Sequence, residues 1–290
     1  MGDLDMIKIA MGQLLVEGGE PERNFERAEK MCKEAQDKEA DLIIFPEAID
    51  FAWTHPSCYK EAVPIPGSFS DKFCEMATQY NLHICVGLTE RREDGRLYNT
   101  ALLIDDKGKI ILKYHKINLL EVEQPFYEVG DRLGVVDTKF GKIGVNICSD
   151  NYMESVHIGK TLGAMGAQII LSPASWTVDY SVTEEDDPYK DKWIKPLSYI
   201  AYLYDALVIS TTSVGYIVGG PYEGKKKIGR SLAVNGDGII KEGQFNEFAG
   251  EVIFLETRIP KREEKGTALT RKIREKGIVP EVERWERKYT

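Results

Sequence analysis

Apolar runs of strand length recur along almost the whole chain, and the segments between them alternate between helix-like and hairpin-like patterns. Helical crossovers mixed with hairpins are typical of mixed β-sheets that are covered by helices. The predicted strands are 7–14, 41–48, 83–91, 167–175, 207–215 and 249–259, with hairpins over 97–119, 133–148 and 229–243. The predicted helices, in which apolar residues recur every three or four positions, are 21–40, 69–80, 154–165 and 192–206.

No linker rich in proline, glycine or serine separates two halves of the chain. We therefore expect a single α/β domain over 1–260, with two stacked sheets and the helices outside. Ser70 is the expected N-cap of the helix 69–80. Residues 177–192, "TVDYSVTEEDDPYKDK", form a long acidic loop of the kind that often serves as a lid or an interface segment. The charged C-terminal tail, 261–290, is expected to pack on the surface or on a neighbouring subunit.

The charge balance and the cysteines argue against several classes of protein. The chain has 38 basic and 47 acidic residues and a net charge of -9, whereas generic nucleic-acid binding needs a basic face. The lysine-rich stretch "GKKKIG" at 224–229 is predicted to be a solvated turn. Five scattered cysteines lack the close spacing of a zinc or redox motif. No ligand cluster suggests a metal or an organic cofactor, so none is expected.

Targeting signals are not evident in the sequence. The N-terminus "MGDLDMIKIA" lacks the basic and apolar regions of a signal peptide. No apolar run approaches the ~18 residues that a membrane span needs. We therefore expect a cytoplasmic protein whose partner is a small molecule rather than a nucleic acid or a membrane.

The stretch "GVNICSDNYMES", residues 144–155, ends an apolar strand on Cys148, just before a turn and a helix. A nucleophile is effective where a sharp turn lifts it clear of the sheet and the backbone N–H groups that follow can bind an oxyanion. The alternative is a half-buried packing thiol, which describes most cysteines. A nucleophilic thiol would also need activation, because only a few per cent of it is thiolate at neutral pH.

Two more ionisable residues come at the ends of predicted strands. Glu47 lies at the end of the apolar run "IIFPEA". A carboxylate is unfavourable there unless it is solvated, paired with a cation or required for function. Lys116 closes the strand in "ILKYHKINL". Taken singly, an ordinary loop glutamate and a surface lysine are the simpler interpretations.

Together, and in this order, "FPE", "YHKINL" and "GVNICSD" resemble the nitrilase superfamily of carbon–nitrogen hydrolases. "EQPFYEVGD" matches the stretch that carries the family's second glutamate, at Glu123 here. "GAQIILSPASW", "IGRSLAVNGDG" and "MIKIAMGQL" are similar to further family motifs, so the resemblance covers about residues 6 to 260. It implies a four-layer α-β-β-α sandwich of two mixed sheets and a triad of Glu47, Lys116 and Cys148. It also implies subunits that pair through outer helices, as a homodimer or higher homo-oligomer.

The resemblance further implies thiol-dependent hydrolysis of a non-peptide C–N bond through a thioester on Cys148, without a cofactor. Glu47 would act as base, then acid, then base again. Lys116 and the N–H of Ser149 would bind the oxyanion. Glu123 would hold Lys116 and the substrate in register.

The expected substrate is a small amide or an N-carbamoyl amine. Asp150, two residues after Cys148, resembles the amidase and carbamoyl-amidase branches rather than the nitrile-hydrolysing members. Ser149, Asn118 and Ser172 replace residues more usual in the family, so an unusual pocket is expected. Nitrile hydrolysis and acyl transfer on the same triad stay open, as does a non-catalytic binding protein on this fold. A papain-like mechanism would need one of the four histidines, which are His55, His83, His115 and His157.

Candidates for substrate contact follow several of the strand ends. Structural packing explains each of them about as well as binding does. The candidate set is Trp53, Tyr127, Ser149, Asn151 and Trp176. No arginine lies beside "CSDNYMES" to bind a substrate carboxylate, which argues against an acidic N-carbamoyl amino acid.

Overall fold

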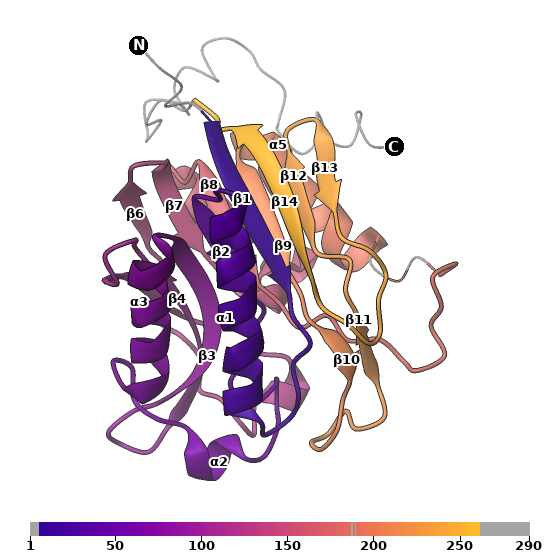
Figure 1. Ribbon diagram of the computed structural model, residues 1–290. Helices are drawn as coiled ribbons and strands as arrows, with labels where there is room; N and C mark the ends of the chain where they lie inside the picture. The colour runs from indigo at the N-terminus through magenta and orange to yellow at the C-terminus, as the bar shows by residue number, and fades with distance from the viewer. Residues whose placement is uncertain (1–5, 187, 189, 262–290) are drawn as a thin grey trace.

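Two six-stranded mixed sheets form the centre of the molecule in the computed structural model, which describes residues 6–261 except 187 and 189 (Figure 1). The first sheet has the order β14-β1-β2-β3-β4-β5, in which β1, β2 and β3 run parallel. Its strands are β1 (Met6–Gln13), β2 (Leu42–Ile44), β3 (His83–Arg91), β4 (Leu97–Ile104), β5 (Ile110–His115) and β14 (Glu251–Arg258).

The second sheet has the order β13-β12-β9-β8-β7-β6, in which β7, β8 and β9 run parallel. Its strands are β6 (Val135–Thr138), β7 (Gly141–Val145), β8 (Ile169–Pro173), β9 (Leu207–Thr211), β12 (Leu232–Asn235) and β13 (Gly238–Glu242). A small third sheet pairs β10 (Val214–Tyr216) with β11 (Lys226–Ile228).

Helices cover the outer faces of both large sheets. On the first sheet these are α1 (Pro21–Asp37) and α3 (Ser68–Tyr80), which lie side by side in Figure 1. On the second they are α4 (His157–Ala164) and α5 (Lys195–Tyr204). The remaining helical segments are α2 (Cys58–Glu61), the 3₁₀ turns Glu121–Glu123, Cys148–Asn151 and Met153–Ser155, and the π-helical turn Lys190–Ile194.

The hydrophobic core explains why these layers stack. Helix α1 buries Phe25, Ala28, Cys32 and Ala35, three or four residues apart, against the outer face of the first sheet. Between the sheets, alternate residues of β1 and β2 pack with those of β7, β8 and β9 in one continuous cluster. The predicted α-β-β-α sandwich of two mixed sheets is therefore confirmed.

Two local predictions differ from the structure, and a third is untested. The strand predicted over 41–48 ends at Ile44, two residues before Pro46, which cannot donate a ladder hydrogen bond. Ser70 is not the N-cap of α3 but its third residue, where its hydroxyl exchanges hydrogen bonds of 2.9 Å with the backbone of Gly67. The predicted tail, 261–290, lies outside the described residues apart from Lys261.

The prediction of a solvated turn at "GKKKIG" is wrong. Lys226 and Lys227 belong to β11 and are only 4% and 2% exposed. Strand β11 is covered on both edges, because β10 pairs with one side and Val178 with the other. Backbone pairing on both edges therefore buries Lys226 and Lys227. The amino-acid composition of this stretch does not predict that pairing.

None of the helices in the described part of the chain combines the length and the apolar character that a membrane span requires.

Candidate active site

Glu47 is held at the seam between the two large sheets. After β2, the backbone N–H of Glu47 donates to the carbonyl of Ala174, which follows β8, over 3.1 Å. Gly87 on β3 makes this path feasible, since a Cβ there would lie 2.6 Å from the Cα of Glu47. The backbone path after β2 thus places the carboxylate of Glu47 in the interior, and this residue is only 1% exposed.

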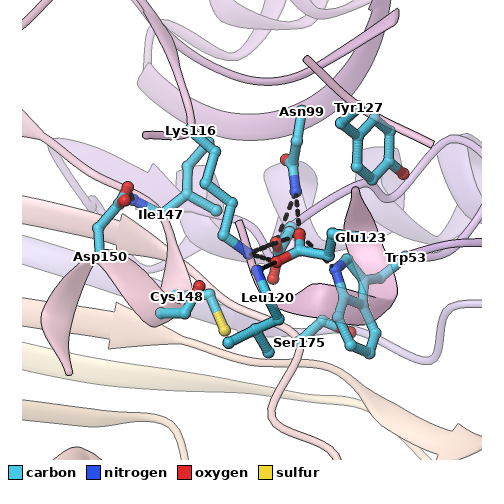
Figure 2. Close-up of polar contacts among 12 residues, drawn as sticks. Trp53, Asn99, Lys116, Leu120, Glu123, Tyr127, Ile147, Cys148, Asp150 and Ser175 are labelled. Carbon is cyan, nitrogen blue, oxygen red and sulfur yellow. Dashed lines mark hydrogen bonds and ion pairs between the residues drawn. The ribbon is translucent and has the colours of Figure 1, made fainter. Parts of the chain in front are cut away.

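Lys116 follows β5 and lies between two carboxylates (Figure 2). Its Nζ is 2.7 Å from Oε1 of Glu47 and 2.8 and 2.9 Å from the two carboxylate oxygens of Glu123. All three side chains are fully buried. The three donors of the ammonium group are therefore used by carboxylate oxygens, and the cation offsets their repulsion.

Further hydrogen bonds fix the two carboxylates. Asn99 on β4 donates from Nδ2 to Glu47 over 2.6 Å and to Glu123 over 3.3 Å. Trp53 donates its indole N–H to Glu123 over 2.8 Å, and the N–H of Leu120 donates to the same carboxylate over 2.9 Å. Oε2 of Glu47 is buried without a hydrogen-bond partner among the described residues. It is the one oxygen of this pair that stays available for a proton.

Cys148 lies on a sharp turn where β7 gives way to a 3₁₀ turn. Ile147 is extended, with φ of -133°, whereas Cys148 has a positive φ of 45°. A residue with a Cβ adopts this left-handed conformation at a cost of about 1–3 kcal/mol, and such strain is concentrated at functional sites. The N–H of Ser149 is in the first turn of the 3₁₀ helix Cys148–Asn151, where backbone donors lack intrahelical partners.

Asp150 holds this turn in place. Its carboxylate accepts hydrogen bonds from the N–H of Ile147 over 2.8 Å, the hydroxyl of Tyr114 over 2.7 Å and the N–H of Asn118 over 2.8 Å. Two of these donors belong to the segment of β5 that carries Lys116, so Asp150 links the cysteine turn to the lysine strand. Burial raises the pKa of Asp150 to about 6, against the opposing effect of these hydrogen bonds.

Replacing Asp150 with alanine is expected to lower the free energy of unfolding by about 3 kcal/mol, because three buried donors lose their acceptor. Tyr114→Phe removes only one of these hydrogen bonds and should lower it by about 1 kcal/mol. Chemical denaturation of both variants measures the difference. Equal stability of Asp150→Ala and the parent protein would contradict this role.

The electrostatic setting favours a protonated thiol beside a basic carboxylate. Burial, followed by the charge of Glu47, raises the pKa of Cys148 well above its ordinary value, and Lys116 opposes this only in part. Burial also raises the pKa of Glu47, against the opposing charge of Lys116. Burial lowers the pKa of Lys116, but the charges of Glu123 and Glu47 outweigh it and keep the ammonium form.

Cys148 opens onto a cavity of about 750 Å³. Trp53, Tyr152 and Ser175 contribute to its walls, and the acidic loop contributes Thr177 and Asp179. The backbone of Ser175 lowers the pKa of Cys148, against the larger effect of burial. A small organic molecule can therefore reach the thiol, with the buried carboxylates behind it.

The structure brings Glu47, Lys116, Glu123 and Cys148 together, and their catalytic roles stay predictions. Of the five residues predicted to contact substrate, Trp53 lines the cavity. The other four, Tyr127, Ser149, Asn151 and Trp176, are not among the described residues that line it.

These four side chains have other surroundings. The hydroxyl of Ser149 donates to the carbonyl of Asn118 over 2.7 Å. The amide of Asn151 exchanges hydrogen bonds with Asn146. Tyr127 accepts a hydrogen bond from the N–H of Thr54, and Trp176 is packed in the main core.

No histidine is bonded to Cys148 in the described hydrogen-bond network. His115 pairs with Glu90 over 2.6 Å, and His55 pairs with Ser57 over 2.8 Å. His83 lies near Asp106. Glu47 is the charged group that affects the pKa of the Cys148 thiol most, which disfavours a papain-like mechanism.

Two features of the site were not predicted from the sequence. Asn99 bridges both carboxylates, and its signal was a lone amide inside the strand "LYNTALLI". Lys227 is buried on β11, where burial lowers its pKa and the charges of Glu47 and Cys148 oppose this in part. Its signal was hidden, because a lysine-rich stretch ordinarily indicates a solvated surface.

Comparison with known proteins places these features in context. The carbon-nitrogen hydrolase family model matches residues 8–261. A nitrilase from Pyrococcus abyssi is 35% identical over 61% of this chain and 68% of its own length. Human omega-amidase NIT2 is 26% identical over 53% of this chain and 59% of its own length, so this alignment spans less than two thirds of that relative.

Solved structures resemble nearly the whole chain. Saccharomyces cerevisiae Nit3, a member of the nitrilase superfamily, has a TM-score of 0.73 at 20% identity and covers 96% of this chain and 97% of its own. The amidase from Nesterenkonia sp. AN1 has a TM-score of 0.76 at 15% identity, covering 93% and 97%. That amidase was solved with the acetamide moiety of fluoroacetamide added to its active-site cysteine. At these identities the likeness shows the fold.

Proposed function

Because the chain belongs to the carbon–nitrogen hydrolase family, we propose that it hydrolyses a small amide or an N-carbamoyl amine through a thioester on Cys148. The observation that carries this proposal is the contact set around Lys116, whose Nζ is 2.7 Å from Glu47 and 2.8 Å from Glu123. Cys148 lies beside this set and opens onto the cavity. A thiol that a small molecule can reach thus lies beside a buried carboxylate and a buried cation, which supports the proposal.

In the first half-reaction, Glu47 accepts the proton of Cys148 and the sulfur attacks the amide carbon. The free oxygen Oε2 of Glu47 is the acceptor that the geometry favours, since Oε1 is occupied by Lys116 and Asn99. A base is necessary here because burial keeps the thiol protonated.

The tetrahedral oxyanion would be bound by the N–H of Ser149 and by the field of Lys116. Such preorganised donors stabilise a transition state by roughly 3–4 kcal/mol each. As this intermediate collapses, Glu47 returns its proton to the departing amine or ammonia, and the C–N bond breaks. An acyl group then remains on the sulfur of Cys148.

In the second half-reaction, Glu47 takes a proton from water, which attacks the thioester carbon. The acid product leaves as the thiol is reprotonated. Acyl transfer would follow the same path with an amine in place of water.

An activity screen tests the proposal. Short aliphatic amides, monoamides of dicarboxylic acids, N-carbamoyl amines and nitriles should be compared, with Cys148→Ala as the blank. Nitriles belong in the screen because the Pyrococcus abyssi relative is named a nitrilase. The proposal expects turnover of at least one amide or carbamoyl amine. Turnover of nitriles alone, or of nothing, would overturn it.

The pH dependence of hydrolysis should reveal the buried base. Glu47 must be deprotonated to act, and its pKa is raised above the ordinary 4.5 by burial. Activity is therefore lost as the pH falls through this raised value, so the acid limb of kcat/KM should lie above pH 4.5. Circular dichroism over the same range separates titration from unfolding. A limb at or below the ordinary glutamate value would contradict the assignment.

We further propose that the protein acts in the cytoplasm as a homodimer or higher homo-oligomer, without a nucleic-acid or membrane partner. The acidic net charge of -9 supports the absence of nucleic-acid binding. Light scattering of the purified chain tests the oligomeric state, and a monomeric mass would contradict it.

A further inference from the structure

Asn99 binds both carboxylates of the site, and the hydrolytic scheme gives it no role of its own. Its Nδ2 donates to Oε1 of Glu47 over 2.6 Å and to Oε1 of Glu123 over 3.3 Å (Figure 2). The side chain is fully buried and is not among the described residues that line the cavity. Hydrogen bonds to an ionised acceptor are roughly twice as strong as those between neutral groups. Glu47 is therefore held from β4 as well as by Lys116.

The other end of the same amide has no partner. Oδ1 of Asn99 is buried and accepts no hydrogen bond from any described residue. The reverse orientation of the amide would point this oxygen at two carboxylates, so the charges of Glu47 and Glu123 require the present one. A buried acceptor without a donor is unfavourable and needs an explanation. The contact of the amide nitrogen with the two carboxylates supplies it.

The backbone of Asn99 holds the cation of the site. Its carbonyl accepts a hydrogen bond of 2.9 Å from the N–H of Lys116, the residue directly after β5. The antiparallel register of β4 and β5, with Thr100 opposite His115, makes this contact possible. Asn99 therefore binds the base through its side chain and the cation through its backbone. A substitution at this position removes the first contact and leaves the second.

The contacts of Glu47 differ between its two oxygens. Oε1 accepts from Nζ of Lys116 over 2.7 Å and from Nδ2 of Asn99 over 2.6 Å, whereas Oε2 has no donor among the described residues. The lone pairs of a carboxylate oxygen lie in the plane of the carboxylate. Two donors on Oε1 therefore fix this plane, and with it the direction of Oε2.

The same contact affects how readily Glu47 takes up a proton. Burial raises the pKa of Glu47, the charge of Lys116 opposes this, and the hydrogen bond from Asn99 acts in the same direction as Lys116. Loss of the Asn99 contact therefore raises this pKa further. Glu47 then becomes protonated, and ceases to be a base, at a higher pH.

We propose that Asn99 is a positioning residue of the hydrolytic reaction, which directs Oε2 of Glu47 toward the proton of Cys148. It acts through Glu47 and does not touch the substrate. This inference rests on the proposed hydrolysis through Cys148. It predicts that the base is still present without the Asn99 amide, but is no longer held for proton transfer.

Asn99→Leu tests this role, because leucine is of similar size but has no donor. It should lower kcat by about 30-fold and change KM by less than about 3-fold, since Asn99 does not contact the substrate. The acid limb of kcat/KM should move to higher pH than in the parent protein. The thermal midpoint should fall by less than about 5 °C, because leucine also removes the unpaired Oδ1.

Asn24→Leu is the matched control. Asn24 on α1 is also fully buried, but both ends of its amide pair with the backbone of Glu17, over 2.9 and 2.8 Å. Its replacement should lower the thermal midpoint at least as much as Asn99→Leu does. It should leave kcat and the acid limb unchanged, because Asn24 has no contact with the two carboxylates.

A second variant covers the case in which leucine does not fit. Asn99→Ala is smaller than the parent side chain and cannot clash, and it should also lower kcat and move the acid limb to higher pH. An acid limb at the parent value in the variants of Asn99 would overturn the inference. A loss of kcat that Asn24→Leu shares, or a rise in KM without a fall in kcat, would also overturn it.

Alkylation of Cys148 separates this inference from the proposed function, because it needs no turnover. Iodoacetamide reacts with the thiolate, which forms when Glu47 takes the proton, and peptide mass analysis follows the adduct on Cys148. The acid limb of this rate should lie at higher pH in Asn99→Leu than in the parent protein. If no amide is hydrolysed but this difference is observed, the proposed function fails and the positioning role stands. If amides are hydrolysed and the two limbs coincide, the positioning role fails and the proposed function stands.

Discussion

Replacing Cys148 with alanine is expected to reduce amide hydrolysis by about 10⁵-fold or more, because Cys148 is the only thiol among the described residues that line the cavity. The loss should appear in kcat, since the sulfur makes a covalent bond only as the reaction proceeds. Steady-state kinetics on the best substrate from the screen measures the loss.

The fold of Cys148→Ala should be retained. Alanine keeps the Cβ and tolerates the same backbone turn as the cysteine, and Asp150 continues to hold that turn through its three hydrogen bonds. Cys74→Ala on α3 is the matched control, since it removes a partly exposed thiol far from the cavity. Residual activity above about 1% in Cys148→Ala, or an equal loss in Cys74→Ala, would contradict the nucleophile assignment.

Replacing Lys116 with methionine is the second large expected effect, and it should harm both stability and activity. Methionine fills similar space but leaves Glu47 and Glu123 facing one another without a cation. Breaking a buried ion pair in this way destabilises a protein by about 3–5 kcal/mol. Loss of the oxyanion-facing cation should lower kcat by a further factor of about 10²–10³.

The destabilisation should depend on pH in a defined direction. Burial already raises the pKa of Glu47, and without Lys116 the opposing charge is lost, so this pKa rises further and the folded state binds more protons than the unfolded chain. Stability therefore falls as the pH rises, and the deficit of Lys116→Met should be smaller at acidic than at alkaline pH. Thermal midpoints at several pH values measure it.

Lys113→Met provides the comparison for this variant. Lys113 lies on β5 and is partly exposed, and its partner Glu90 keeps a second hydrogen bond to His115. Its loss should lower stability by about 1 kcal/mol or less. Equal effects of the two substitutions would show that Lys116 has no special place between the carboxylates.

The fold was largely predictable, because the spacing of apolar residues and the residue types found in turns depend on short stretches of sequence. The apolar face of α1 and the hairpins β4–β5 and β12–β13 were expected from spacing alone. Strand β11 was not, since its buried lysines depend on pairing with Val178 and with β10. Ser70 was predicted to be the N-cap of α3 but is its third residue. A serine at either position gives a similar sequence pattern.

The site was predictable only in part. Glu47 and Lys116 are 69 residues apart, and each alone had an ordinary explanation. They were grouped with Cys148 because the three motifs that contain these residues occur in the same order as in one family. The number of residues between them did not predict the grouping. Asn99 and Lys227 were missed for the same physical reason: their partners are brought near only when the ends of β2, β5, β7 and β8 meet at one seam. The side chains of Ser149 and Asn151 were expected at the substrate, but their hydrogen bonds are made to the cysteine turn and its neighbours instead.

The central claim is that Cys148 carries the acyl group during turnover. Acid quenching of the protein while it hydrolyses its best amide, followed by peptide mass analysis, tests it directly. The account predicts an adduct whose mass follows the acyl part of each amide, located on Cys148 and absent from the other four cysteines. Turnover at full rate with no adduct on any peptide, or an adduct that stays when Cys148 is replaced by alanine, would contradict it.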